Sequence, residues 1–143
     1  MELHYKYPNE ICCLRGFRVE RDDDDNIARY TNWKKLNGFQ KPSFNIFHTS
    51  GGGTLYKSAY FSTEVLNKDI FQEKCFHADD VWLNVMAQIN NTRTVKSEFY
   101  SHLIPIQSNS IKLSRQNVAE GGNDKQLSAV LDHYKIKSNE IFK

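Results

Sequence analysis

The stretch that most constrains the fold is HADDVWLNVMAQINN, residues 77–91. Four of its apolar residues recur at intervals of three and four, which is the spacing of one stripe along an α-helix: Trp82, Val85, Met86 and Ile89. The pattern predicts a helix over residues 79–89, ended by the two asparagines that follow.

A second stripe of the same spacing predicts a helix over residues 124–135, with Leu127, Val130, Leu131 and Tyr134 on its apolar face. Asn123 is its expected N-cap, with Gln126 placed as in a capping box. Short helices are expected at 3–7 and 67–74, strands at 11–20, 27–33, 44–48, 54–56 and 93–99, and irregular chain at 37–43 and 102–122. This order of helices and strands predicts an α/β class of α+β character, with one domain over residues 1–143 that has a small mixed sheet and flanking helices.

Composition excludes several classes of protein. At 143 residues, with 13% aromatic residues, the chain is too rich in core formers to be disordered, and it holds no apolar run long enough to span a membrane. Nineteen basic residues are scattered among seventeen acidic ones, which argues against a nucleic-acid surface. Three cysteines, Cys12, Cys13 and Cys75, make no disulfide framework and suit reduced thiols in the cytoplasm.

Asp79 and Asp80 are the residues most suggestive of chemistry, because two carboxylates open the predicted helix just after His77. The positive end of the helix dipole favours negative charge at that position. One aspartate would suffice to cap the helix, so two readings stay open: simple capping, or a catalytic carboxylate.

Two glycine-containing segments are further candidates. Gly51, Gly52 and Gly53 follow a predicted strand, where they would form either a flexible loop or a close approach for a ligand. Gly121-Gly122 precedes the last helix, whose free N–H groups, helped by Lys125, could hold an anion; an ordinary helix start is the alternative. Neither segment has a P-loop or GxGxxG pattern, and the acidic run Asp22–Asp25 is expected to be a solvated turn.

Several stretches, taken in order, resemble one family. They are Tyr7-Pro8-Asn9-Glu10, Arg15-Gly16-Phe17-Arg18, Tyr30-Thr31-Asn32-Trp33, Lys41-Pro42-Ser43, Gly51-Gly52-Gly53-Thr54-Leu55-Tyr56, Ala78-Asp79-Asp80-Val81-Trp82-Leu83 and Gly122-Asn123-Asp124-Lys125-Gln126. Together they are similar to part of a bacterial glycosyltransferase of GT-A type, a family that builds lipopolysaccharide, capsule and other surface glycans. The resemblance runs from Tyr5 to Tyr134.

The resemblance implies a nucleotide-sugar donor, a glycan acceptor and, in full-length members, a divalent metal (Mn²⁺ or Mg²⁺) held by a DxD motif on the diphosphate. It implies Asp80 as the general base, with Asp79 capping or orienting. Gly51, Gly52, Gly53 and Trp82 would bind donor or acceptor. Asn123, Asp124, Lys125 and Gln126 would lie near the diphosphate. No metal ligand is assigned to this chain.

In such enzymes the nucleotide-binding half comes first and ends in the DxD strand followed by a helix. This chain begins at what resembles the end of that helix, so we expect it to be the acceptor-side, C-terminal part of the catalytic domain, inactive alone. A sheet without its first strands would expose an edge and self-associate there. The alternative is a non-catalytic carbohydrate-binding or interaction module, with Trp33, Tyr56 and Trp82 as stacking residues.

Overall fold

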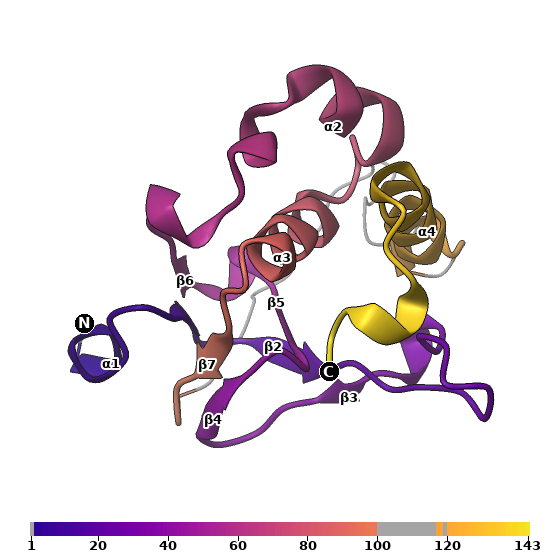
Figure 1. Ribbon diagram of the computed structural model, residues 1–143. Helices are drawn as coiled ribbons and strands as arrows, with labels where there is room; N and C mark the ends of the chain where they lie inside the picture. Colours follow the sequence, from indigo (N-terminus) through magenta and orange to yellow (C-terminus); the bar gives the residue numbers. More distant parts are fainter. Residues whose placement is uncertain (1, 100–116, 119) are drawn as a thin grey trace, which may run out of the picture.

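The computed structural model describes residues 2–99, 117, 118 and 120–143 (Figure 1). Within this part of the chain the structure is mixed α/β, with four helices and two small sheets. The helices are α1 (Glu2–Lys6), α2 (Lys68–Lys74), α3 (Asp79–Ile89) and α4 (Gly122–Tyr134). The strands are β1 (Ile11–Cys13), β2 (Gly16–Arg18), β3 (Lys34–Lys35), β4 (Gln40–Ser43), β5 (Ile46–His48), β6 (Thr54–Leu55) and β7 (Thr94–Lys96).

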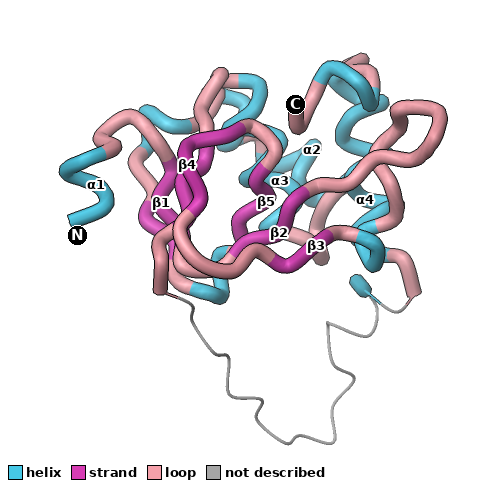
Figure 2. Tube along the Cα trace, turned by 90° about the horizontal axis from the view of Figure 1, so that it is seen from below, coloured by secondary structure: helices cyan, strands magenta, loops and turns pink. Residues whose placement is uncertain are grey.

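The two sheets lie side by side, as Figure 2 shows, and the chain passes from one to the other between β1 and β2. The first sheet has the strand order β4-β7-β1-β6, in which β1 and β7 are parallel and the other pairs antiparallel. The second is antiparallel, in the order β3-β2-β5. At the crossing, Leu14 N–H donates to the Gly53 carbonyl and the Arg15 carbonyl accepts from Thr49 N–H. The loop after β5 is therefore bonded to the point where the sheets meet.

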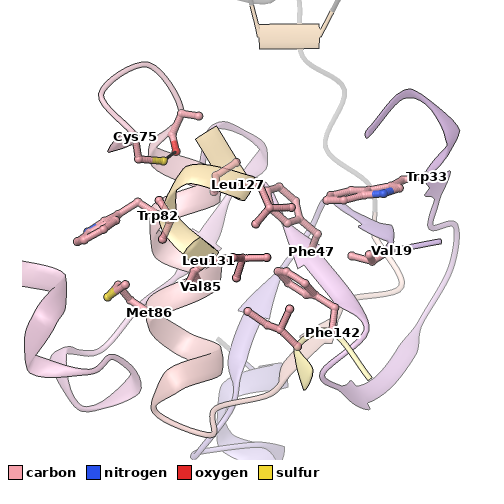
Figure 3. Close-up of a cluster of buried hydrophobic side chains, with 14 residues drawn as sticks. Val19, Trp33, Phe47, Cys75, Trp82, Val85, Met86, Leu127, Leu131 and Phe142 are labelled. Atoms are coloured by element: carbon pink, nitrogen blue, oxygen red, sulfur yellow. Dashed lines mark hydrogen bonds between the residues drawn. The ribbon is translucent and has the colours of Figure 1, made fainter. Parts of the chain in front are cut away.

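The main core lies where α3 and α4 meet the second sheet (Figure 3). Six consecutive or near-consecutive residues of α3 are buried, and its expected stripe faces this core except for Ile89, which is 38% exposed. From α4, Leu127, Val130 and Leu131 are buried against it, as their spacing predicts. Phe142, next to the C-terminus, packs in tilted contacts against the rings of Trp33 and Phe47 and closes the cluster. Burial of this apolar surface fixes the start of α3 relative to the strands.

The sequence predictions for the two long helices are confirmed, with α3 spanning the expected residues and α4 beginning two residues early. The expected cap of α4 is wrong: its N-cap is Gly121, with φ of 71°, and Asn123 lies inside the helix. Glycine suits that left-handed backbone because it has no Cβ.

Three predictions about strands are also wrong. The single strand expected over residues 11–20 is two strands, β1 and β2, which belong to different sheets. Residues 37–43, expected to be loop, contain β4, because Gln40 and Ser43 pair with β7 across an irregular register that accommodates Pro42. Residues 27–33, expected to be a strand, form only one bridge, from Ile27 to Arg21, and then the 3₁₀ turn Tyr30–Asn32. That turn directs aromatic rings into the core, so tertiary packing overrides the local strand preference.

The remaining predictions concern smaller features. The acidic run is an exposed turn, in which Asp22 accepts hydrogen bonds from the backbone of Asp24 and Asn26. The three cysteines are free and buried. Most of the irregular stretch expected over residues 102–122 lies outside the described residues. Of the helices that the structure describes, none is long and apolar enough to cross a membrane.

Candidate functional site

The start of α3 meets the glycine loop through Ser50, the residue directly before Gly51. Ser50 N–H donates to Asp80 Oδ1 at 2.7 Å, and the Ser50 hydroxyl contacts both Asp80 Oδ1 and Asp79 Oδ2, the latter at 3.2 Å. With a single hydrogen, that hydroxyl donates to one carboxylate at a time. We call Asp79, Asp80, Ser50 and Gly51–Gly53 the aspartate–glycine site.

Helix capping does not account for the two aspartates. The N-cap of α3 is Ala78, which has no side-chain cap hydrogen bond, while the Asp80 carboxylate turns to Ser50 in the loop after β5. Asp80 Oδ1 receives both bonds from Ser50, and Oδ2 receives none from the residues described. One oxygen is thus anchored by Ser50, and the other has no hydrogen-bond donor among the described residues.

Burial raises the pKa of Asp80 above its ordinary value of 3.8, and the neighbouring charge of Asp79 raises it further. The two hydrogen bonds from Ser50 and the positive charge of Arg15 act in the opposite direction without cancelling the effect of burial. A carboxylate with a raised pKa binds a proton more readily than an exposed one, which suits a general base.

The three glycines lie in three different environments. A Cβ at Gly51 would meet no described atom within 4 Å, so this position is open. A Cβ at Gly52 would lie 2.5 Å from Arg15 Cβ and 3.1 Å from Thr49 Oγ1, so the space is already filled by protein. Gly53 has φ of 92°, a conformation that favours glycine. Only Gly51 fits the expectation of a loop kept clear for a ligand.

Asn84 holds the site together and was not singled out in the sequence. It lies one turn after Asp80 in α3 and is 1% exposed. Its Oδ1 accepts from His48 N–H, and its Nδ2 donates to the carbonyls of His48 and Asp80. This amide therefore ties α3 to the end of β5, two residues before Ser50. In the sequence, Asn84 could have been noticed as a polar residue among the apolar residues of the predicted helix.

Two phenols and a guanidinium interact electrostatically with the Asp80 carboxylate. Burial raises the pKa of Tyr30 to about 12, and the charge of Asp80 contributes to that shift. Burial also raises the pKa of Tyr56, again with a contribution from Asp80. Both hydroxyls therefore stay protonated at neutral pH. Arg15 acts on the same groups, because its charge lowers the pKa of both Asp80 and Tyr30.

The third sequence motif, Asn123–Gln126, lies beside the entry to α3. Gln126 Oε1 accepts from His77 N–H at 2.9 Å, and Asp124 Oδ1 accepts from Tyr30 N–H at 2.7 Å. Asn117 Nδ2 donates to the His77 carbonyl from the other side. These side chains bond to the protein itself and position the start of α3, whereas Lys125 is exposed. The start of α3 therefore contacts the residue before the glycine loop through Ser50 and the third motif through His77 and Gln126.

Two of the candidate ligand-binding rings lie outside the site. Trp82 is 3% exposed in the core, with its indole N–H donating to the Val65 carbonyl, and Trp33 is 6% exposed and donates to the Ala28 carbonyl. Neither presents a free ring face to a ligand. Tyr56, the third candidate for stacking, is half-buried beside His48.

The described residues do not fit a divalent metal. Asp79 and Asp80 stand together, but no group of three or more histidine, cysteine, aspartate or glutamate side chains in the described part of the chain could hold an ion. Mg²⁺ takes six oxygen ligands, and the two aspartates supply too few of them without the waters and phosphates of a bound substrate.

Comparison of the chain with protein-family models, with curated proteins and with solved structures finds no match.

Proposed function

We propose that this chain supplies the acceptor side of a glycosyl-transfer site, as part of a GT-A-type domain that makes surface polysaccharide in the cytoplasm. A sugar would pass from a nucleotide-sugar to a hydroxyl group of a glycan acceptor. The observation that carries the proposal is the contact of Asp79 and Asp80 with the Ser50–Gly51 turn. The contacting residues are 29 and 30 positions apart in the sequence.

Asp80 is the proposed base. Ser50 fixes Oδ1, so Oδ2 can accept the proton of the acceptor hydroxyl. As that proton moves to Oδ2, the acceptor oxygen forms a bond to the anomeric carbon of the donor sugar. The bond from that carbon to the diphosphate breaks, and its electron pair leaves with the nucleoside diphosphate. The raised pKa of Asp80 makes the proton transfer more favourable.

Asp79 has a supporting role in this proposal. Its Oδ2 lies 3.2 Å from the Ser50 hydroxyl, and its charge raises the pKa of Asp80. In full-length family members a metal neutralises the diphosphate. Because the described residues do not fit such an ion, no step proposed for this chain depends on one, and we expect donor binding to require groups beyond these.

The non-catalytic glycan-binding module remains the second candidate, favoured by that same poor fit to a metal. A test begins by screening the chain against a glycan array and measuring affinity for the best ligand in the wild type, in Asp80→Asn and in Asp69→Asn. Asp69 is the matched control, since it is an exposed aspartate in the first turn of another helix, α2. Release of nucleoside diphosphate is then followed with UDP-, GDP- and dTDP-sugars in the presence of that glycan and MnCl₂.

Glycan binding that weakens about tenfold in Asp80→Asn, and not in Asp69→Asn, is the expected result, since a charged hydrogen bond is lost. Acceptor-dependent release of nucleoside diphosphate that requires Asp80 would extend the proposal to turnover by this chain. Glycan binding that does not depend on Asp80, without release of nucleoside diphosphate, would favour the binding module. Absence of any glycan ligand would contradict both readings.

A further inference from the structure

Arg15 brings a positive charge to the aspartate–glycine site. It lies at the crossing from β1 to β2, and its carbonyl accepts from Thr49 N–H. Its stem runs against the loop so closely that a Cβ at Gly52 would lie 2.5 Å from Arg15 Cβ and 3.1 Å from Arg15 Cδ. The guanidinium therefore belongs to the same surface as Ser50 and Gly51.

This guanidinium has no polar partner among the residues that the structure describes. It makes no ion pair there, and its Nε is enclosed without a hydrogen bond. Apart from its electrostatic effect on Asp80 and Tyr30, the guanidinium interacts with the Phe17 ring, whose centroid lies 5.7 Å from Cζ. A cation–π contact uses the charge of the guanidinium and not its N–H donors, so these donors have no hydrogen-bond partner among the described residues. A half-buried guanidinium without a hydrogen-bond partner lowers the stability of the folded protein unless a ligand pairs with it.

Asp80 does not serve as that partner. Arg15 lowers the pKa of Asp80 through space, but the hydrogen bonds to Asp80 Oδ1 come from Ser50. Planar guanidinium forks bind carboxylate and phosphoryl groups through two parallel hydrogen bonds. The aspartates beside it would repel an anion in any other position, so they would also orient such a ligand.

We propose that Arg15 binds an anionic substituent, a carboxylate or a phosphoryl group, on the glycan acceptor and makes the site selective for acidic glycans. This inference rests on the proposed function, since it places the acceptor at Asp80. A sugar whose hydroxyl meets Asp80 Oδ2 brings its ring substituents to the Gly51–Gly52 backbone, along which the Arg15 stem runs. Arg15 is a binding and specificity residue here, and Asp80 keeps the role of base.

The test compares ligands that differ only in charge. Calorimetry or NMR titration measures affinities for trigalacturonic acid, for its neutral galactose counterpart, and for galactose 6-phosphate against galactose. The proteins are the wild type, Arg15→Gln, Arg15→Lys and Arg18→Gln. Glutamine keeps the part of the stem that touches Gly52, while Arg18 is an exposed arginine on β2 that bonds to Gln40 and serves as the control. Thermal unfolding confirms that each variant is folded.

We expect at least one acidic ligand to bind about tenfold more tightly than its neutral counterpart. That advantage should vanish in Arg15→Gln, shrink in Arg15→Lys and persist in Arg18→Gln. The galacturonate and phosphate arms show which anion is preferred. Equal binding of charged and neutral ligands, or an advantage that survives in Arg15→Gln, would overturn the inference. The inference would also be overturned if inorganic pyrophosphate bound in an Arg15-dependent way while acidic sugars did not bind. Arg15 would then recognise the diphosphate of the donor and not the acceptor.

The two proposals fail in different ways. If neutral glycans bind and depend on Asp80 but not on Arg15, the proposed function stands and the acidic specificity is wrong. If acidic ligands depend on Arg15 while no ligand depends on Asp80, Arg15 is an anion site and the acceptor-side function is wrong.

Discussion

His48 makes the fold itself sensitive to pH. It ends β5, is 0% exposed, and has Nδ1 3.2 Å from Thr94 Oγ1. Its Nε2 has no hydrogen-bond partner among the described residues. Burial lowers the pKa of His48 from 6.5 to about 3, because a charged imidazolium would lose its hydration there. The folded protein therefore keeps this side chain neutral at pH values where the unfolded chain protonates it.

The sign and size of the effect follow from this difference in pKa. The stability contributed by neutral His48 is fully present above pH 6.5 and is lost as pH falls from 6.5 towards 3. Each pH unit in that window costs about 1.4 kcal/mol, so the free energy of unfolding should fall by about 2 kcal/mol at pH 5. Asp80 acts in the opposite direction, since its raised pKa contributes stability that is lost as pH rises. A comparison of variants that all retain Asp80 cancels its contribution.

The assay is urea unfolding of the wild type and of His48→Asn at pH 7 and pH 5. Asparagine keeps a polar atom near the position of Nδ1 but does not titrate. The variant should be less stable at pH 7, and the difference should narrow by about 2 kcal/mol at pH 5. His133→Asn, on the exposed face of α4, should follow the wild type. If the difference between wild type and His48→Asn were the same at both pH values, the reasoning about burial would be refuted.

Three further predictions concern the loop and the sheet edge. Gly52→Ala should lower the free energy of unfolding by about 1–3 kcal/mol, because the added Cβ would meet the Arg15 stem. Gly51→Ala should change the free energy of unfolding little, because its Cβ would meet no described atom. Urea unfolding of both variants tests this, and equal losses of stability would contradict it. Ser50→Ala removes a hydroxyl donor to Asp80 and should raise the pKa of that carboxylate further, as measured by carbon-13 NMR titration; an unchanged or lower pKa would show that the hydroxyl does not stabilise the charge. The chain should form dimers through the open edge of the first sheet at β6, which light scattering would detect, and a monodisperse monomer would contradict this.

The spacing of apolar residues predicted the two long helices well, because the faces that this spacing identifies are the faces buried in the core. Trp82, Val85 and Met86 are buried on α3, and α4 buries its expected face. The strands were harder to predict because their partners are distant in sequence. β4 exists because β7, more than 50 residues later, pairs with it, and its own sequence contains Pro42. Local propensity cannot report such a pairing.

The site was predictable in part. The pattern of adjacent aspartates and glycines pointed to Asp80 and Gly51, and these segments lie together through Ser50. The roles of Asn84 and Arg15 could not be read from sequence, since each depends on a contact between distant segments. The individual reasons for the glycines at 51, 52 and 53 also require the coordinates of neighbouring atoms.

The most direct test of the central claim is to titrate the isotopically labelled protein with the best glycan ligand from the array and follow the backbone amide signals by NMR. We expect the largest shifts to fall on Ser50, Gly51 and Asp80, and to diminish in Asp80→Asn at the same glycan concentration. Shifts confined to other parts of the chain, with Ser50, Gly51 and Asp80 unmoved at saturation, would contradict it.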